Sequence, residues 1–212
     1  MSSQTPASSS HQADHYLLRA DSTIAAVIVT HNRPELLAHS LDQVARQTRP
    51  VQHIIVVDNG ADQAVEDLVA DKAGDRGIYL PSRTNLGGAG GFAYGFLTAL
   101  SLGVDAIWCA DDDGRPADAE VLETLLTVGV REGLAEVSPI VTNIEEPDRL
   151  AFPLRQGLVW RRRVDELEGD FLPGIASLFN GALISAAAME VIGVPDYRLS
   201  LIHISEPTRL GM

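Results

Sequence analysis

Three consecutive carboxylates, Asp111, Asp112 and Asp113, end a short apolar run in the stretch DAIWCADDDGRP at residues 105–116. Two like charges about 4 Å apart repel by roughly 4 kcal/mol at an effective dielectric constant near 20, although neighbouring side chains can point apart. Aligned carboxylates are the hard oxygen ligands that Mg²⁺ and Mn²⁺ prefer, and a divalent ion would remove the repulsion. The alternative interpretation is an acidic turn in which Asp112 or Asp113 caps the next helix.

A glycine-rich stretch, PSRTNLGGAGGFAYGF at residues 81–96, is the second candidate for chemistry. Residues 88–93 match the dinucleotide fingerprint G-x-G-x-x-A, and the three acids follow about 20 residues later, so a nicotinamide- or flavin-dependent oxidoreductase is a rival interpretation. That fingerprint should begin directly after its strand, yet seven residues separate Leu80 from Gly88. A ribose also needs only one carboxylate. A third interpretation is that the glycines allow close packing of a helix on a sheet.

Apolar runs alternate with helix-period patterns along the chain, which predicts an α/β fold with a mostly parallel sheet and helices on both faces. Asn32 and Glu35 have the spacing of a capping box at the first helix. Residues 143–170 are polar and irregular in pattern. Buried strands are predicted at residues 24–29, 53–60, 77–80, 105–110 and 136–141, and helices from residue 34, over 64–70, after the glycine stretch and from residue 116.

Polar clusters follow four of the predicted strands at the point where each strand ends. In open α/β sheets, ligands bind beyond the carboxyl ends of the strands, so these clusters are expected to converge on one site. Asp58 could hydrogen-bond a base or a ribose there, or stabilise the turn that it begins. The clusters are Thr30-His31-Asn32, Asp58-Asn59-Gly60, Pro81-Ser82-Arg83 and the three acids.

Composition narrows the class of protein. The 212 residues suit one domain, and the net charge of −13 argues against a nucleic-acid partner. The single cysteine, Cys109, permits no intrachain disulfide and indicates a reducing, cytoplasmic setting. No apolar run approaches the length of a membrane span. Residues 1–22 lack the features of a secretory signal and are expected to form a mobile polar tail.

The ordered motifs resemble those of inverting nucleotide-sugar glycosyltransferases of family 2, which have the Rossmann-like GT-A fold. Within that family the glycine stretch and the DDDG end are most similar to rhamnosyl- and galactofuranosyltransferases. The resemblance implies a catalytic domain over residues 23–199, UDP-galactofuranose as donor, and a polyprenyl-diphosphate-linked glycan acceptor in cell-wall galactan synthesis. The matching stretches are VIVTHNRPELL, HIIVVDNG, RTNLGGAGGFAYG, CADDDG and LFNGALIS.

Carried over by position, the resemblance assigns roles to residues at the predicted strand ends. Asp58 would meet the uracil, and Asp111 and Asp113 would hold a divalent metal, Mg²⁺ or Mn²⁺. Asp111 would also touch the nucleotide, and Asp112 is a further nucleotide-sugar-binding candidate of undetermined role. The remaining residues expected along the nucleotide, ribose and diphosphate are Thr30, His31, Asn32, Arg33, Arg83 and Asn85.

The base that takes the proton from the acceptor hydroxyl is expected, by the same resemblance, after the GVPDYRL stretch. Residues 200–212, SLIHISEPTRLGM, depart from the family altogether. We therefore expect the GT-A domain to be incomplete at its C-terminus, residues 200–212 to be a non-native tail, and the base to be absent from the chain. Asp196 precedes the expected position. A non-catalytic nucleotide-sugar-binding fragment is accordingly an alternative.

A basic cluster in the irregular stretch consists of Arg155, Trp160, Arg161, Arg162 and Arg163. It could face anionic lipid or a diphosphate, or form a solvated basic loop. A lipid-linked acceptor would imply work at the inner face of the plasma membrane without a membrane span, and this cluster is the candidate for a peripheral contact.

Overall fold

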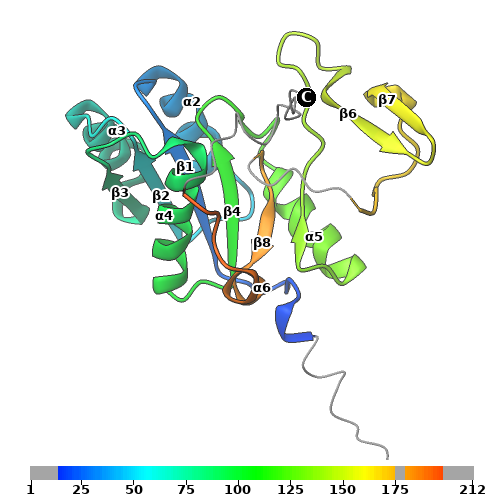
Figure 1. Cartoon of the computed structure of the whole chain (residues 1–212), viewed down its shortest axis with the longest axis horizontal. Helices are drawn as coiled ribbons and strands as arrows, with labels where there is room; N and C mark the ends of the chain where they lie inside the picture. The colour runs from blue at the N-terminus through cyan, green and yellow to red at the C-terminus, as the bar shows by residue number, and fades with distance from the viewer. Residues whose placement is uncertain (1–13, 175–179, 198–212) are drawn as a thin grey trace, which may run out of the picture.

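A six-stranded sheet with strand order β3-β2-β1-β4-β8-β5 forms the centre of the molecule (Figure 1). The computed structural model describes residues 14–174 and 180–197. Strands β1 (Ile24–Thr30), β2 (His53–Asp58), β3 (Gly77–Pro81) and β4 (Ala106–Asp111) are mutually parallel. Strand β8 (Leu183–Ser185) runs antiparallel to both β4 and β5 (Glu136–Val137). The predicted mostly parallel α/β sheet is confirmed.

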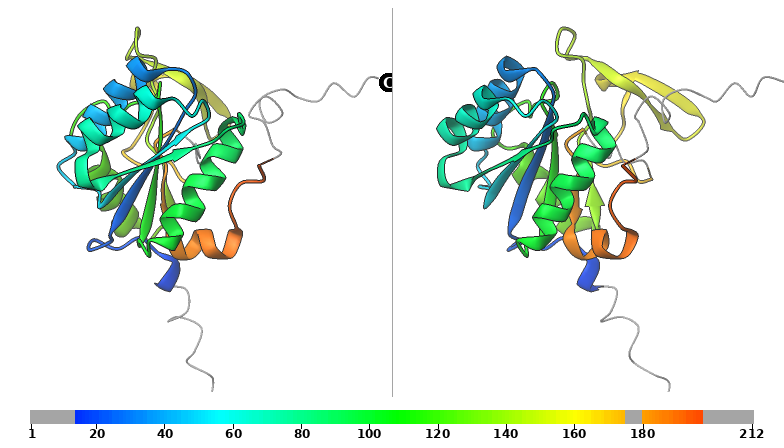
Figure 2. Two further views of the ribbon diagram at one scale, coloured as in Figure 1. Left: turned by 90° about the vertical axis from the view of Figure 1, so that its left-hand side faces the viewer. Right: turned by 60° about the vertical axis from the view of Figure 1, so that its left-hand side comes forward.

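Helices cover both faces of this sheet (Figure 2). Successive β1 residues alternate between two cores, with Ile24, Ala26 and Ile28 in one and 25, 27 and 29 in the other, as the two-residue period of a strand requires. The first core contains residues of α2 (Pro34–Ala45), α3 (Gln63–Ala73) and α5 (Val121–Glu132). The second contains residues of α4 (Gly87–Ser101) and α6 (Ala186–Ile192).

The glycine-rich stretch lies mostly inside α4 rather than in a loop before it, because the helix begins at Gly87. Two of its glycines face strand β1. A Cβ atom at Gly91 would lie 2.5 Å from Val29 Cγ1, and one at Gly95 would clash with Val27 Cγ1. The interpretation that the glycines allow close packing of helix on sheet is confirmed for these two positions.

Two local predictions for helix starts are wrong. Asn32 does not form a capping box, because it has a left-handed backbone with φ of 56° and Arg33 occupies the N-cap position without a side-chain cap bond. Helix α5 begins at Val121, not at residue 116. The side-chain amide of Gln47 donates to Asp118 O at 2.7 Å and accepts from the N–H of Leu122 at 2.9 Å. This long-range contact sets the start of α5.

The segment from residue 136 to 170 also differs from expectation. Only Glu136–Val137 of the strand predicted at 136–141 is formed. The stretch expected to be irregular contains an antiparallel hairpin of β6 (Arg149–Gln156) and β7 (Val159–Arg163), which stands apart from the central sheet in Figure 1. Most of its side chains are exposed, so no alternation of apolar and polar residues marked it as a pair of strands.

Part of the polar tail expected at residues 1–22 packs against the domain instead, from about residue 18. Leu18 is buried and its N–H donates to Leu134 O at 2.9 Å, after the short 3₁₀ helix η1 (Asp14–Tyr16). Arg19 forms an ion pair with Asp105 at 2.6 Å. Residues 1–13 of the tail and the expected non-native tail at 200–212 lie outside the described residues. No helix within the described ranges is long and apolar enough to cross a membrane.

Asp105 ties this N-terminal segment to the sheet, and its substitution should destabilise the protein in a pH-dependent way. Its carboxylate accepts from the N–H of Thr23 at 2.8 Å, from Thr23 Oγ1 at 2.7 Å and from Arg19, and these bonds hold the pKa of Asp105 below its usual value. A carboxylate whose pKa is lower in the folded state than in the unfolded state stabilises the fold at pH values above its unfolded pKa of about 4. That stabilisation is lost as the pH falls through the folded-state pKa.

We therefore expect Asp105→Asn to lower the free energy of unfolding by about 1–3 kcal/mol at pH 7, with the difference shrinking below about pH 4. Urea denaturation at several pH values would measure this. Asp21→Asn is the matched control, because Asp21 pairs with the same Arg19 but its side chain is 86% exposed, so it should cost less than about 0.5 kcal/mol. A difference for Asp105→Asn that is constant from pH 7 to pH 3 would contradict the assignment.

Gly95→Ala tests the contact between α4 and β1. The added methyl group must displace Val27 or move the helix, and such overpacking costs about 1–3 kcal/mol, more than the gain of about 1 kcal/mol in helix propensity. A lower melting temperature is expected by calorimetry. A stabilised variant would show that helix and strand are farther apart than described.

Candidate functional site

The carboxyl ends of the parallel strands bring most of the predicted polar clusters to one edge of the sheet. Thr30 at the end of β1 is in register with Asp58 of β2, and Val29 is in register with Asp111 at the end of β4. Strand β3, whose end leads to Arg83, is separated from β4 by β2 and β1. The acids, Thr30 and Asp58 are therefore near neighbours, whereas Arg83 lies at the far side of the same edge.

The three acids form a cluster in which one carboxylate oxygen from each residue lies within 4.8 Å of the others. Asp112 is buried, Asp111 is half-buried and Asp113 is exposed. Thr30 Oγ1 donates to Asp112 Oδ2 at 2.8 Å. Arg33 joins the two later acids, with its Nε 3.2 Å from Asp112 Oδ2 and its Nη1 2.8 Å from Asp113 Oδ2. Neither acid caps α5, so the helix-cap interpretation is wrong.

The electrostatics of the cluster fit a divalent cation. Burial raises the pKa of Asp111 to about 6, with further contributions from the charges of Asp113 and Asp112. Burial also raises the pKa of Asp112, against the opposing effects of Thr30 and Arg33. Asp112 Oδ1 is buried and has no hydrogen-bond partner among the described residues. Among the described residues, Arg33 is the one arginine that forms an ion pair with these acids, so the cluster of hard oxygen donors leaves room for more positive charge, which Mg²⁺ or Mn²⁺ supplies well.

Asp58 holds the loop after β2 together. It is fully buried, its Oδ1 accepts from the N–H of Gly60 at 2.7 Å, and its Oδ2 accepts from the N–H of Asp62 at 2.7 Å and from Tyr79 Oη at 3.0 Å. Burial, together with this bond to Asp58, raises the pKa of Tyr79. The turn-stabilising interpretation of Asp58 is confirmed. Its predicted contact with uracil stays a prediction.

Asn59, which belongs to a predicted polar cluster but has no role assigned from the sequence, connects this loop to α4. Its side chain is buried, its Oδ1 accepts from the N–H of Leu86 at 3.2 Å, and its Nδ2 donates to Gly87 O at 3.3 Å. Asn85 Oδ1 accepts from the N–H of Gly87 at 2.8 Å. Asn85 and Arg83 are both exposed, so their predicted place along a nucleotide requires a ligand that spans the edge.

His31 and Asn32 follow β1 beside the acids. His31 is half-buried, its Nδ1 has no hydrogen-bond partner among the described residues, and its Nε2 lies 3.4 Å from Asn32 Nδ2. Asn32 also limits Gly60, because a Cβ atom there would lie 2.6 Å from Asn32 Oδ1. The ends of β1 and β2 are therefore packed directly against each other.

Two further residues next to the acids were missed. Ser40 of α2 is buried and donates from Oγ to Asp111 O at 3.0 Å. Asn180 lies beside the DDDG stretch, since a Cβ atom at Gly114 would be 3.8 Å from Asn180 Oδ1 and 3.6 Å from Asp111 Cβ. The N–H of Cys109 donates to Ala182 O at 2.8 Å, which aligns the segment before β8 with β4. The stretch LFNGALIS was the available signal for Asn180.

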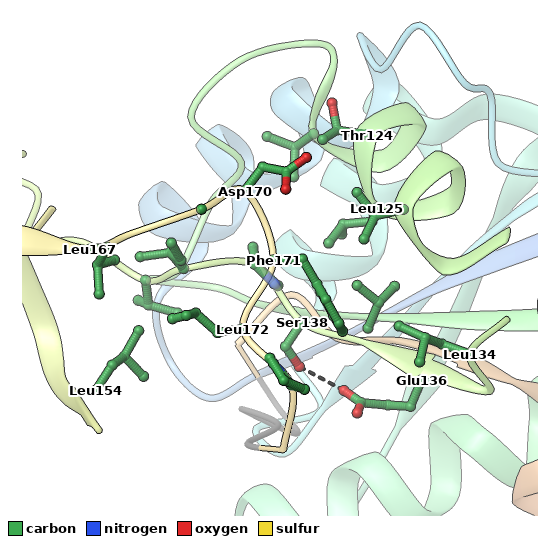
Figure 3. A pocket seen from close by; sticks show the side chains of 18 of the residues that line it. Thr124, Leu125, Leu134, Glu136, Ser138, Leu154, Leu167, Asp170, Phe171 and Leu172 are labelled. Atoms are coloured by element: carbon green, nitrogen blue, oxygen red, sulfur yellow. Dashed lines mark hydrogen bonds between the residues drawn. The ribbon is translucent and has the colours of Figure 1, made fainter. Parts of the chain in front are cut away.

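A separate cavity of about 800 Å³ lies between α5, β5 and the β6–β7 hairpin (Figure 3). Its wall is largely apolar, with Leu125 from α5, Leu154 from β6 and Phe171 among the lining residues. Ser138 Oγ donates to Glu136 Oε1 at 2.7 Å within it. The described lining contains none of the three acids, so this cavity is distinct from the site at the strand ends.

Curated relatives are closely similar in sequence. The chain is 58% identical over 183 residues to galactofuranosyltransferase GlfT1 of Mycolicibacterium smegmatis, covering 83% of this chain and 60% of that protein. It is 57% identical over 183 residues to galactofuranosyltransferase GlfT1 of Mycobacterium tuberculosis, covering 84% and 60%. The chain thus spans about 60% of the length of these relatives.

Solved structures share the fold at low sequence identity. Staphylococcus aureus TarS 1–349 matches with a TM-score of 0.62 and 12% identity, over 85% of this chain and 52% of that one. The mannosyltransferase PcManGT of Pyrobaculum calidifontis, solved in complex with GDP-Man and Mn²⁺, matches with a TM-score of 0.53 and 14% identity, over 89% and 54%. These matches confirm the GT-A-like architecture.

The family itself follows from the sequence. A family model described as glycosyl transferase family 2 matches residues 25–184, which include every strand of the central sheet except the last residue of β8 and the first of β1. With this match, the identity to the two relatives and the acid cluster at the end of β4, the chain belongs to glycosyl transferase family 2.

Proposed function

We propose that the chain carries the nucleotide-sugar half of an inverting, metal-dependent glycosyltransferase that moves galactofuranose from UDP-galactofuranose to a lipid-linked glycan in cell-wall galactan synthesis. The observation that carries the proposal is the cluster of three carboxylates at the end of β4, held by Thr30 and Arg33. The identity of 57–58% to galactofuranosyltransferases supports the choice of sugar. A nucleotide diphosphate beside this cluster would need a cation to offset both sets of negative charge.

Asp111 and Asp113 are the residues that would hold a divalent ion. Asp113 is exposed and can reach a ligand, whereas Asp112 is buried and bound to Thr30 and Arg33, so we assign Asp112 a positioning role. When bound, Mg²⁺ or Mn²⁺ supplies positive charge that stabilises a departing diphosphate. The PcManGT complex holds both GDP-Man and Mn²⁺.

The protein's own residues would bind and orient the donor. The nucleotide would be bordered by Thr30, His31, Asn32 and Arg33. The exposed Arg33 guanidinium lies next to Asp113, which supports this assignment. Arg83 and Asn85 would approach the donor from the loop after β3, where both side chains are exposed. In an inverting transfer, the acceptor oxygen forms a bond to the anomeric carbon, the bond from that carbon to the diphosphate breaks, and a carboxylate takes the hydroxyl proton.

The proton-accepting carboxylate would come from a different stretch of the chain than the donor site. The family resemblance places it after the GVPDYRL stretch, where residues 200–212 lie outside the description. Donor binding and base function would thus reside in different stretches of sequence, and donor binding can be tested separately.

The rival interpretation, a nicotinamide-dependent oxidoreductase, loses its main support. Gly91 and Gly95 are explained by packing against β1, and the chain belongs to a glycosyltransferase family.

Binding of UDP should depend on a divalent ion and on the exposed acid. By calorimetry, UDP with Mn²⁺ is expected to bind at least about tenfold more tightly than UDP with EDTA, and Asp113→Asn should lose most of that gain because it removes a ligand and a charge. Asp118→Asn removes the same charge from the same loop, where Asp118 is exposed and caps only the N–H of Glu120, and should bind like the unchanged chain. UDP binding that EDTA and Asp113→Asn leave unaltered would contradict the metal assignment.

Thr30→Val tests whether Thr30 positions the cluster. The substitution keeps the shape of the side chain but removes the donor to the buried Asp112, so the free energy of unfolding should fall by about 1–3 kcal/mol. Affinity for UDP with Mn²⁺ should fall about 10–100-fold, as for other groups that orient metal ligands. Thr98→Val is the control, because Thr98 is half-buried on α4, away from the acids, and its Oγ1 donates to Tyr94 O of the same helix. Equal effects of the two substitutions would contradict the positioning role.

A further inference from the structure

The β6–β7 hairpin combines exposed apolar side chains with a high density of arginine. Residues 149–163 contain five arginines and no acidic residue, in a chain whose net charge is −13. At the turn, Gly157 has φ of 63° and Leu158 is 90% exposed. Trp160 is 60% exposed, although large aromatic side chains are usually buried. A solvated basic loop accounts for the arginines but leaves Leu158 and Trp160 unexplained.

The strand register sorts these side chains onto two faces. Arg155 is directly opposite Trp160, and Arg162 follows Trp160 by two residues, so the three share one face. Leu154 is opposite Arg161 on the other face, and both are half-buried. Leu154 lines the cavity in Figure 3. Arg155 also contributes to the lining, although its strand position places it on the face of Trp160. The face with Arg155, Trp160 and Arg162, together with Leu158 at the turn, is called the outer face below.

The ion pairs follow the same division. On the inner face, Arg161 pairs with Glu168 at 3.7 Å, and Arg163 pairs with Asp165 at 3.2 Å and Asp148 at 3.9 Å. Within the described residues, Arg155 and Arg162 of the outer face form no ion pair; Arg155 Nε donates only to Gly157 O, at 2.9 Å. The outer face therefore carries two positive charges with no acidic partner, beside an exposed indole and an exposed leucine.

We propose that the outer face of the β6–β7 hairpin docks the protein onto an anionic lipid bilayer. Tryptophan lies preferentially at the level of lipid headgroups, leucine at a turn can enter the acyl boundary, and arginines without acidic partners attract anionic headgroups. A nucleic acid is a poorer fit because, with a net charge of −13, the chain as a whole is repelled by phosphate backbones. The same net charge favours an approach of the bilayer from the hairpin side.

Docking through this face has a geometric consequence. The hairpin stands at the end of the molecule toward which β4 points, the same end as the acid cluster (Figure 1). A bilayer on the outer face would therefore lie nearer to the strand ends than to the opposite edge of the sheet. The lipid-linked acceptor at this site is part of the proposed function, so this consequence rests on that function. The docking of the hairpin onto lipid does not depend on it.

Sedimentation with vesicles tests the proposal on the full 212-residue chain. Vesicles of phosphatidylcholine with about 30% phosphatidylglycerol should bind the chain, and vesicles of phosphatidylcholine alone should bind it far less. Each arginine near an anionic surface contributes about a fivefold factor, so Arg155→Gln with Arg162→Gln should weaken binding on the order of 25-fold. Leu158→Ser with Trp160→Ser should also weaken it, and binding should fall as salt is raised from 0.1 to 0.5 M.

A matched control removes the same charge from the same hairpin. Arg149→Gln with Arg163→Gln alters arginines that already pair with Glu146, Asp148 and Asp165, and should weaken binding less than about fivefold. Circular dichroism of each variant verifies folding, and all substituted side chains are exposed, so unfolding is not expected to obscure the result.

Tryptophan fluorescence gives an independent readout of which face meets the lipid. The chain has two tryptophans, and Trp108 is 1% exposed, so a blue shift on adding anionic vesicles reports Trp160. Trp160→Phe should abolish the shift while the protein still sediments with vesicles. Equal binding to neutral and anionic vesicles, equal effects of the two arginine pairs, or no shift would each overturn the proposal. UDP binding with Mn²⁺, measured in the same samples, does not depend on lipid binding. Docking can therefore fail while the proposed function stands, and the proposed function can fail while docking stands.

Discussion

The buried carboxylate of Asp112 is the constraint on which the site depends. It lies at the end of β4 between Asp111 and Asp113, and it is held by Thr30 at 2.8 Å and by Arg33 at 3.2 Å. Burial of a carboxylate is costly unless donors and opposite charge compensate it. Thr30 ends the central strand β1 and Arg33 precedes α2, so the first βα unit exists in part to satisfy an acid that lies about 80 residues later. Asp113 also pairs with Arg33, at 2.8 Å, but its side chain stays exposed at the edge of the sheet, where a ligand can reach it.

The elements packed around β4 determine the shape of the edge that carries the acids. Gly91 and Gly95 let α4 approach β1 closely, and Asn59 fixes the start of α4 to the loop after β2. On the other side of β4, the antiparallel β8 aligns with it, and the segment before β8 places Asn180 beside the acids. The edge is therefore assembled from both sides of β4, by parallel units on one side and an antiparallel return on the other.

The sequence alone predicted those features that local pattern determines. Apolar runs locate β1 to β4, and their alternation with helices predicts Thr30, Asp58 and the acids at one edge, as the strand register confirms. What it missed depends on contacts between distant residues. The start of α5 is set by Gln47, whose amide bonds both Asp118 and Leu122, and no local signal reports this. The capping box failed because Asn32 adopts a left-handed backbone instead. The hairpin at 149–163 was missed because its strands lack an alternating pattern of apolar and polar residues. Asn180 was missed because residue spacing does not show that the chain returns as an antiparallel strand beside β4.

Manganese electron paramagnetic resonance tests the central claim most directly, because the signal of free aqueous Mn²⁺ disappears when the ion is bound. Titration of the chain with Mn²⁺ should give a UDP-dependent loss of that signal approaching one ion per chain, and the loss should be greatly reduced in both Asp111→Asn and Asp113→Asn. Undiminished loss of signal in both variants, or tight UDP binding with no bound Mn²⁺, would contradict the assignment of the acids at the end of β4 to a metal-dependent nucleotide-sugar site.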